Sequence, residues 1–391
     1  MFKKSAVLVA LTFLSFHIKG QDIPTDYLSA EFHKNRRDKV RELMTPNSVL
    51  VFFANAERNR ANDIDYLYHQ DPDFYSLTGY KEPNAVLLIF SEVQKAATGL
   101  TYNELIYVQK RDLSAEQWNG KRLGVEGVKN ILGFEMAFNG EEFLDVPIDF
   151  STFNSVSFFD FENDYRDKRG DSDLFDMIKI FKEKANYPID YNAAKQALYT
   201  RITSTPIENS ANVAQILGRY LNTNTNLKKD ELLVQFANST DNLVRKEIRE
   251  KVMVIQKTNN LDSSMISEIM RKLRETKTEE ELVLLKKAIE ISAVGQIEVM
   301  KAMHPNMSEI EIQGVHEYVY KKYGAEYEGY HSIVGGGNNG CILHYIENNK
   351  SNVGNDLVLM DLGAEYHGYT ADVRRTIPAN GTFSVEQKAV Y

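Results

Sequence analysis

The stretch Asp361–Pro378, DLGAEYHGYTADVRRTIP, reads as a tight β-hairpin that carries two aspartates eleven positions apart. A two-residue loop at His367–Gly368 places Asp372 opposite Gly363 on the facing strand. Asp361 lies two positions before Gly363, and side chains two apart on a strand share a face. Both aspartates are therefore predicted to project from one side of the ribbon, with the space over the glycine between them.

Two carboxylates that converge over a gap suit a divalent cation. The same register places Arg374 opposite Asp361, however, where a cross-strand ion pair would explain the carboxylate without a metal. Two carboxylates are also too few ligands for a catalytic transition-metal site. The hairpin alone leaves a metal site and a structural ion pair both open.

His344, in the stretch GCILHYI, is a second candidate. We predict a strand here, with Ile342 and Ile346 on the face of His344, and a histidine in that setting is more often a core residue than a catalyst. Cys341 is an odd number of positions away and would face the other side, which argues against a thiol–imidazole dyad. The Gly-rich segment Val334–Gly340 lacks the lysine and the helix of a phosphate loop, so we interpret it as a turn.

The composition allows two domains and excludes one class of partner. The chain has 391 residues, of which 43% are hydrophobic, enough for two cores. Its net charge of −9 argues against nucleic-acid binding, because a phosphate backbone requires a basic surface.

The first residues, MFKKSAVLVALTFLSFHIKGQ, have two lysines, a short apolar run and a small residue, Gly20. This arrangement is typical of a secretory signal peptide, which we expect at residues 1–20. We therefore expect export to the periplasm or the extracellular space, with no membrane association after cleavage. The single cysteine, Cys341, leaves an exported chain without an internal disulfide.

Apolar strands interspersed with helical patterns predict an α/β domain over residues 21–265. The predicted strands are Ser48–Asn55, Asn84–Phe90 and Asn103–Lys110. The first predicted helix is capped by Ser29 and runs to about Met44, with Phe32, Val40 and Leu43 pointing inward. Two further helices are predicted, one at Asp173–Ala185 and one from Asn192 onward. The polar stretch 223–260 is expected to be surface helix and loop.

A second domain is expected over residues 266–391. Thr278 and Glu281 form a capping box at the start of a long helix. Its apolar face is predicted to consist of Leu282, Leu285, Ile289, Ala293, Ile297 and Met300. A second helix begins at Ser308, and short strands follow, including the hairpin. A further helix begins at Ser384 and stops after two turns, so we expect the domain to be cut short.

Longer stretches resemble a known family. EGYHSIVGGGNNGCILHYIENN (328–349) and NDLVLMDLGAEYHGYTADVRRTIPANGTFS (355–384) closely resemble the aminopeptidase P (Xaa-Pro aminopeptidase) branch of the pita-bread metallopeptidases. Residues 59–90, 111–124 and 274–288 resemble the N-terminal domain and linker helix of that family. The resemblance covers most of residues 28–130 and 270–391.

The resemblance implies an α/β N-terminal domain followed by a pita-bread catalytic domain. It implies hydrolysis that releases the N-terminal residue of a peptide with proline at position two, at two divalent metal ions, usually manganese. Asp361 and Asp372 would be metal ligands, and His344 would bind substrate near the scissile bond. Asp63 and Trp118 match positions that reach the substrate region of a neighbouring subunit in oligomeric members, which implies a homo-oligomer. The plain alternatives are a solvated loop residue for Asp63 and a half-buried aromatic for Trp118.

Two departures from the family pattern leave rival functions open. Arg374 stands where the family usually has threonine, and a cation beside the metals would weaken their binding. The remaining family ligands, one histidine and two glutamates, lie downstream of the hairpin and are absent, so this chain alone is expected to be inactive. The rivals are a non-catalytic pita-bread binding or interaction protein that has lost the metal site, and a prolidase or creatinase-type hydrolase.

Overall fold

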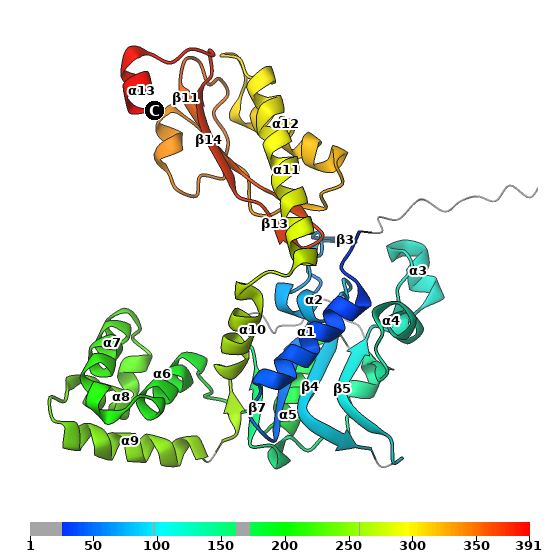
Figure 1. Cartoon of the computed structure of the whole chain (residues 1–391), viewed down its shortest axis with the longest axis vertical. Helices are drawn as coiled ribbons and strands as arrows, with labels where there is room; N and C mark the ends of the chain where they lie inside the picture. The colour runs from blue at the N-terminus through cyan, green and yellow to red at the C-terminus, as the bar shows by residue number, and fades with distance from the viewer. Residues whose placement is uncertain (1–25, 97, 162–172, 258) are drawn as a thin grey trace, which may run out of the picture.

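The computed structural model describes residues 26–96, 98–161, 173–257 and 259–391. The expected signal peptide lies outside these residues. Within them the chain forms an α/β domain, a small helical unit and a second domain built on a long helix (Figure 1).

A six-stranded mixed sheet forms the centre of the first domain, with the strand order β6-β5-β4-β1-β7-β8. The strands are β1 Ser48–Phe53, β4 Val86–Lys95, β5 Thr101–Val108, β6 Ala137–Asn139, β7 Ser155–Phe158 and β8 Leu261–Asp262. A separate small hairpin consists of β2 Asn59–Ala61 and β3 Ile64–Asp65. The three strands predicted from apolar runs are confirmed, as β1, β4 and β5.

The strand β1 is continuously apolar because both of its faces are buried. Leu50 and Phe52 pack into one core, which α1, α2, α4 and α10 cover. Val49 and Val51 alternate with them and pack into a second, aromatic core, which α5 covers. The covering helices are α1 Ala30–Leu43, α2 Pro72–Thr78, α4 Gly124–Leu132, α5 Leu174–Lys184 and α10 Met265–Glu275. The short helix α3 Leu113–Asn119 covers neither core, because none of its residues is buried.

The predicted N-terminal helix is confirmed as α1. Its N-cap Ser29 accepts a hydrogen bond from the Phe32 backbone N–H at 3.1 Å, and Phe32 and Val40 are buried. Leu43 was expected to point inward, but 44% of it is exposed, because it lies in the last turn, where the helix leaves the core.

Four helices between β7 and α10 form a unit with its own apolar core. They are α6 Ala193–Ser204, α7 Ser210–Thr223, α8 Glu231–Asn238 and α9 Asn242–Lys257. The expectation of surface helix over 223–260 is confirmed in part: α8 and α9 have solvated faces, but Leu233, Phe236, Ile248 and Val252 are buried. Figure 1 shows this unit beside the sheet and away from the second domain.

The second domain packs α11 Glu279–Ala302 and α12 Glu309–Lys322 against a three-stranded sheet of order β10-β11-β14. Its strands are β9 Tyr327–Glu328, β10 Ile333–Gly336, β11 Leu357–Leu362, β12 Ala364–Tyr366, β13 Tyr369–Thr370 and β14 Val373–Pro378. The short helix α13 Val385–Val390 follows, capped by Ser384 as predicted.

Both predicted capping boxes are present, at Thr278 with Glu281 and at Ser308 with Glu311. The predicted apolar face of α11 is wrong: Ile289, Ile297 and Met300 are exposed. A neighbouring stripe is buried instead, consisting of Leu284, Ala288, Ile291, Gly295 and Val299. Its small residues allow α12 to approach closely, since a Cβ on Gly295 would lie 3.0 Å from His316 Nδ1.

The expected domain boundary at residue 265 falls directly before α10. Ile266, Ile269 and Met270 of this helix pack into the first core. We therefore propose that the transition between the domains lies in the short link between α10 and α11. No helix among the described residues has the length and apolarity needed to cross a membrane.

Candidate functional site

The hairpin has the register that its sequence predicts. Asp361 pairs with Arg374 and Leu362 with Val373 between β11 and β14. Tyr366 pairs with Tyr369 between β12 and β13, which leaves His367–Gly368 as the loop. Their φ angles of 50° and 85° suit the type I′ turn that joins two strands with right-handed twist.

Gly363 allows the two strands to approach closely midway along the hairpin. A Cβ at this position would lie 1.7 Å from the carbonyl oxygen of Ala371 and 3.2 Å from Tyr330 Cε1. The glycine therefore makes room for the backbone of the facing strand, rather than leaving an open gap. Its carbonyl accepts a hydrogen bond of 2.9 Å from the Gly329 N–H, which ties the ribbon to β9.

Asp361 and Asp372 converge on one side of this ribbon, as predicted. The Tyr330 hydroxyl lies 2.7 Å from Asp361 Oδ1 and 3.4 Å from Asp372 Oδ1. Burial of the phenol and its bond to Asp361 raise the pKa of Tyr330, so it remains a donor. The Asp361 side chain is 10% exposed and that of Asp372 is 58% exposed, which places one carboxylate inside and the other at the rim.

Arg374 contacts both carboxylates through the oxygens that Tyr330 does not contact. Its Nε donates to Asp361 Oδ2 at 2.6 Å, and its Nη2 donates to Asp372 Oδ2 at 3.3 Å. The bond to Asp361 raises the pKa of the guanidinium, which stays charged. The structural ion pair that the sequence left open is therefore present.

The donor set fits part of a metal centre. Two carboxylates with one cation already between them provide the oxygens that a divalent cation prefers. Within the described ranges, no group of three or more His, Cys, Asp or Glu side chains is placed to hold a metal. Asp361 and Asp372 would thus hold a metal only together with further ligands.

His344 lies on a loop, and the predicted strand over GCILHYI is wrong. A 3₁₀ turn at Gly337–Cys341 follows β10 directly, and His344 is exposed. A Cβ on Gly335 would lie 2.6 Å from the Gly340 backbone nitrogen, so the chain folds back on itself here. The structure does not bury this histidine in a core, which removes the alternative that the pattern favoured.

The loop that carries His344 is organised by a buried carboxylate that the sequence analysis missed. Glu309, fully buried at the start of α12, accepts hydrogen bonds from the Gly336 N–H at 2.7 Å, the Tyr345 hydroxyl at 2.7 Å and the Lys350 N–H at 2.9 Å. Burial alone would raise the pKa of Glu309, but these bonds outweigh it and lower the pKa. The only sequence signal was its place next to the capping residue Ser308.

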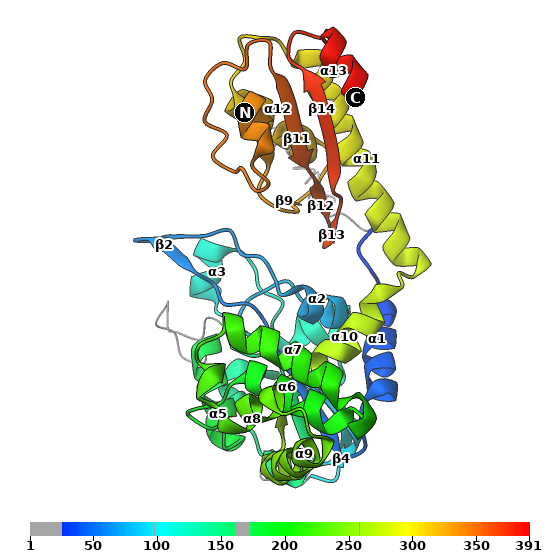
Figure 2. The ribbon, with the colours of Figure 1, turned by 90° about the vertical axis from the view of Figure 1, so that its left-hand side faces the viewer.

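Asp63 and Trp118 lie on the first domain and contact none of the residues above. Asp63 is exposed in the turn between β2 and β3. Trp118 is 89% exposed on α3, which buries none of its residues, so the half-buried alternative is wrong. Figure 2 shows β2 and α3 on the side of the first domain that faces the second domain.

The tip of the hairpin docks on the first domain. His367 is stacked on Tyr27 at 3.6 Å and bonds Asp26 at 3.0 Å, and within its own domain it also bonds Glu326 at 2.6 Å. Burial would raise the pKa of Glu326, but its bonds with His367 outweigh this and lower the pKa to about 2. A Cβ on Gly368 would lie 2.6 Å from a ring carbon of Tyr75 on α2. The domain contact thus fixes the ribbon that carries both aspartates.

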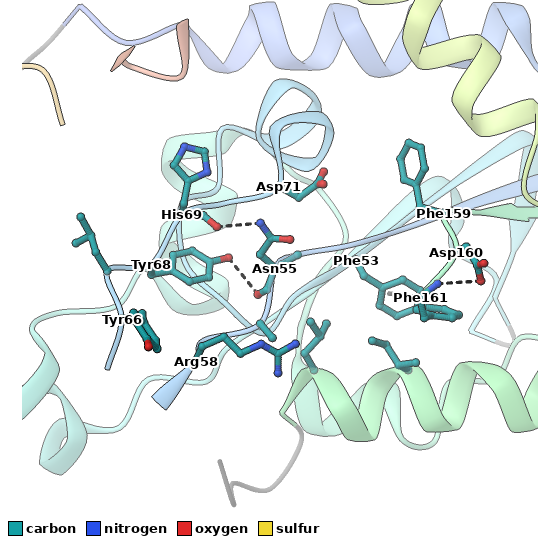
Figure 3. A pocket seen from close by; sticks show the side chains of 15 residues that line it. Phe53, Asn55, Arg58, Tyr66, Tyr68, His69, Asp71, Phe159, Asp160 and Phe161 are labelled. Carbon is teal, nitrogen blue, oxygen red and sulfur yellow. Dashed lines mark hydrogen bonds between the residues drawn. The ribbon is translucent and has the colours of Figure 1, made fainter. Parts of the chain in front are cut away.

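A separate pocket of about 630 Å³ lies in the first domain, at the carboxyl ends of β1 and β7 (Figure 3). Phe53, Tyr68 and Phe161 line it together with Asn55 and His69. His69 also bonds Glu365 of β12 at 2.8 Å, so one residue of the pocket wall contacts the hairpin.

Comparison with known proteins assigns both domains. The family profile for the aminopeptidase P N-terminal domain matches residues 33–150, and that for metallopeptidase family M24 matches residues 283–391. The chain is 30% identical over 366 residues to the Xaa-Pro aminopeptidase of Haemophilus influenzae and 29% identical over 366 residues to that of Escherichia coli. Each match covers 93% of this chain but only 64% and 65% of the relatives.

Solved structures give the same result. Aminopeptidase P from E. coli in a low-pH form has a TM-score of 0.64 at 26% identity, covering 92% of this chain and 65% of that one. The Pseudomonas aeruginosa aminopeptidase PepP has a TM-score of 0.65 at 25% identity, covering 93% and 65%. The chain therefore belongs to the aminopeptidase P family, with the N-terminal α/β domain of that family followed by the pita-bread domain of the M24 metallopeptidases.

Proposed function

We propose that the protein is an Xaa-Pro aminopeptidase, which hydrolyses the bond ahead of a penultimate proline and releases the N-terminal residue. One observation carries the proposal. Asp361 and Asp372 project from one face of a ribbon whose register, turn and close glycine contact are all fixed by the fold. The relatives named Xaa-Pro aminopeptidase support the substrate class.

The chemistry is that of a two-metal hydrolase. Bound divalent ions, for which we propose manganese, would polarise the scissile carbonyl and supply a water that is nucleophilic at neutral pH. A zinc-substituted E. coli aminopeptidase P in complex with product shows a metal in one relative. In this chain Asp361 and Asp372 would hold the ions, and Tyr330 would fix the orientation of both carboxylates through its hydroxyl.

His344 would act on the substrate rather than on the metal. Its exposed imidazole lies on a loop whose backbone is fixed by Glu309, so it is accessible to a peptide yet limited in movement. We propose that it binds the substrate near the scissile bond. Asp63 and Trp118, both exposed, would reach the substrate of a neighbouring subunit in a homo-oligomer.

Two further expectations belong to this proposal. We propose export through the signal peptide at residues 1–20, which N-terminal sequencing of the secreted or periplasmic protein would test. We also propose that a polypeptide of residues 21–391 is inactive by itself, because the described residues bring together only two carboxylates.

The rival proposal is a non-catalytic binding or interaction protein of the same fold. The contact of Arg374 with both aspartates favours it, since this ion pair satisfies the carboxylates without metal. The two proposals differ in whether the protein turns over any Xaa-Pro peptide.

We assign the activity to a full-length form of the protein that supplies the further ligands, and all tests use this form. The assay uses a tripeptide that begins Xaa-Pro, an Xaa-Pro dipeptide, and added Mn²⁺ or a chelator. We expect turnover that is lost with chelator, and faster turnover of the tripeptide, because a prolidase would favour the dipeptide. Asp372→Asn should remove activity, whereas Asp145→Asn, the same change at an exposed site in the first domain, should not. No turnover of either peptide by correctly folded protein would favour the binding protein.

A further inference from the structure

The side chain of Arg374 lies where both carboxylates of the site converge. It is directly opposite Asp361 in the β11–β14 register. Its Nε is 2.6 Å from Asp361 Oδ2, and its Nη2 is 3.3 Å from Asp372 Oδ2. One guanidinium thus bridges the two aspartates through the Oδ2 atom of each.

We propose that Arg374 is a built-in cation of this site, which neutralises Asp361 and Asp372 until a divalent metal ion displaces it. The inference rests on the proposed function, since it takes both aspartates to be metal ligands. A carboxylate oxygen that accepts a short charged hydrogen bond from arginine has its lone pairs directed at the guanidinium. A bound metal would therefore compete with the guanidinium for the two carboxylates.

Exposure indicates which partner leaves. The Arg374 side chain is 65% exposed, so the guanidinium can move into solvent and remain hydrated. Asp361 is 10% exposed and is fixed on its other oxygen by Tyr330 at 2.7 Å. The carboxylate stays in place while the arginine exchanges.

The electrostatics explain why a cation of some kind is needed. Without one, two negative carboxylates would face each other across the ribbon, one of them largely buried, and would repel each other. Arg374 removes this repulsion when metal is scarce. The same contact weakens metal binding, because the ion must first displace the arginine.

Arg375 provides a matched control. It is the next residue on β14, it carries the same charge, and it pairs with Met360 rather than with an aspartate. Its Nη1 donates to the backbone carbonyl of Arg374 at 2.5 Å. Arg375→Thr therefore removes one positive charge near the site without removing a contact to either carboxylate.

The experiment measures Mn²⁺ binding to the full-length protein by calorimetry, together with thermal melting of chelator-treated samples. Arg374→Thr should bind Mn²⁺ about tenfold more tightly than Arg375→Thr, which corresponds to about 1.4 kcal/mol. Chelator-treated Arg374→Thr should also melt at a lower temperature than Arg375→Thr, and Mn²⁺ should restore it.

The outcomes separate this inference from the proposed function. If wild type and both variants bind Mn²⁺ with equal affinity, the aspartates bind metal but Arg374 does not compete, and the inference is overturned. If none of the three binds Mn²⁺, the metal site itself is wrong and both proposals fail. An equal gain of affinity in both variants would mean that the net charge alone matters, which also overturns the inference.

Discussion

Replacing Gly363 by alanine should separate the two strands that carry the candidate ligands. The new Cβ would lie 1.7 Å from the Ala371 carbonyl oxygen, and contacts below 3.0 Å essentially never occur, so the strands must move apart by about 1.3 Å, the difference between the two. This movement strains two bonds that hold the ribbon, from the Ala371 N–H to Ala364 at 3.0 Å and from the Gly329 N–H to Gly363 at 2.9 Å.

The cost can be worked from these contacts. Overpacking with a backbone shift costs about 1–3 kcal/mol, and each weakened hydrogen bond adds roughly 0.5–1.5 kcal/mol. A total of about 3 kcal/mol should lower the melting temperature by on the order of 10 °C. Since the shift moves Asp372 relative to Asp361, the affinity for Mn²⁺ should also fall.

Differential scanning fluorimetry of the full-length protein, with and without Mn²⁺, tests both effects. The control is Gly314→Ala in the middle of α12, where a Cβ meets nothing within 4 Å. That change should raise the helix stability by roughly 0.5–1 kcal/mol. A Gly363→Ala protein that melts within about two degrees of wild type would refute the close approach of the strands.

Three other predictions concern the loop and the histidines. Glu309→Gln removes the buried charge that accepts the loop hydrogen bonds, so the free energy of unfolding should fall by about 2–3 kcal/mol. Chymotrypsin should also cut the loop at Gly337–Asn349 faster, as mass spectrometry would show. Burial lowers the pKa of His33 and of His316 to about 4. Stability that is present above the unfolded-state pKa of about 6.5 should therefore be lost as pH falls toward 4, by up to about 3 kcal/mol for each histidine. Urea unfolding at pH 7 and pH 5 measures this loss. The hydrogen bond with Glu365 raises the pKa of His69. This contact should therefore stabilise the protein fully below about pH 6.5 and less as pH rises through the raised pKa. In a Glu365→Gln variant this pH-dependent loss of stability should vanish.

The hairpin could be derived from the sequence because its determinants are local. A two-residue loop fixes every pair in the ribbon once its centre is known, so the placement of Asp361 opposite Arg374 followed from counting. The capping boxes and the apolar strands were found for the same reason, since each is set by residues close together in the chain.

The errors come from contacts that the local pattern does not contain. Two apolar stripes run along α11, and which one is buried depends on Gly295 admitting His316 from another helix. The segment around His344 has the alternation of a strand, but Glu309, 35 positions earlier, draws its backbone into a loop. The arginine contact with Asp372 was also missed, because only its partner directly opposite follows from the register.

The number of Mn²⁺ ions that the full-length protein binds tests the central claim most directly. Equilibrium dialysis followed by elemental analysis should find two ions per chain, in a site that depends on Asp361 and Asp372. The double variant Asp361→Asn with Asp372→Asn, folded as judged by circular dichroism, should bind fewer than one. Two ions bound equally well by the double variant, or none by the wild type, would contradict the account.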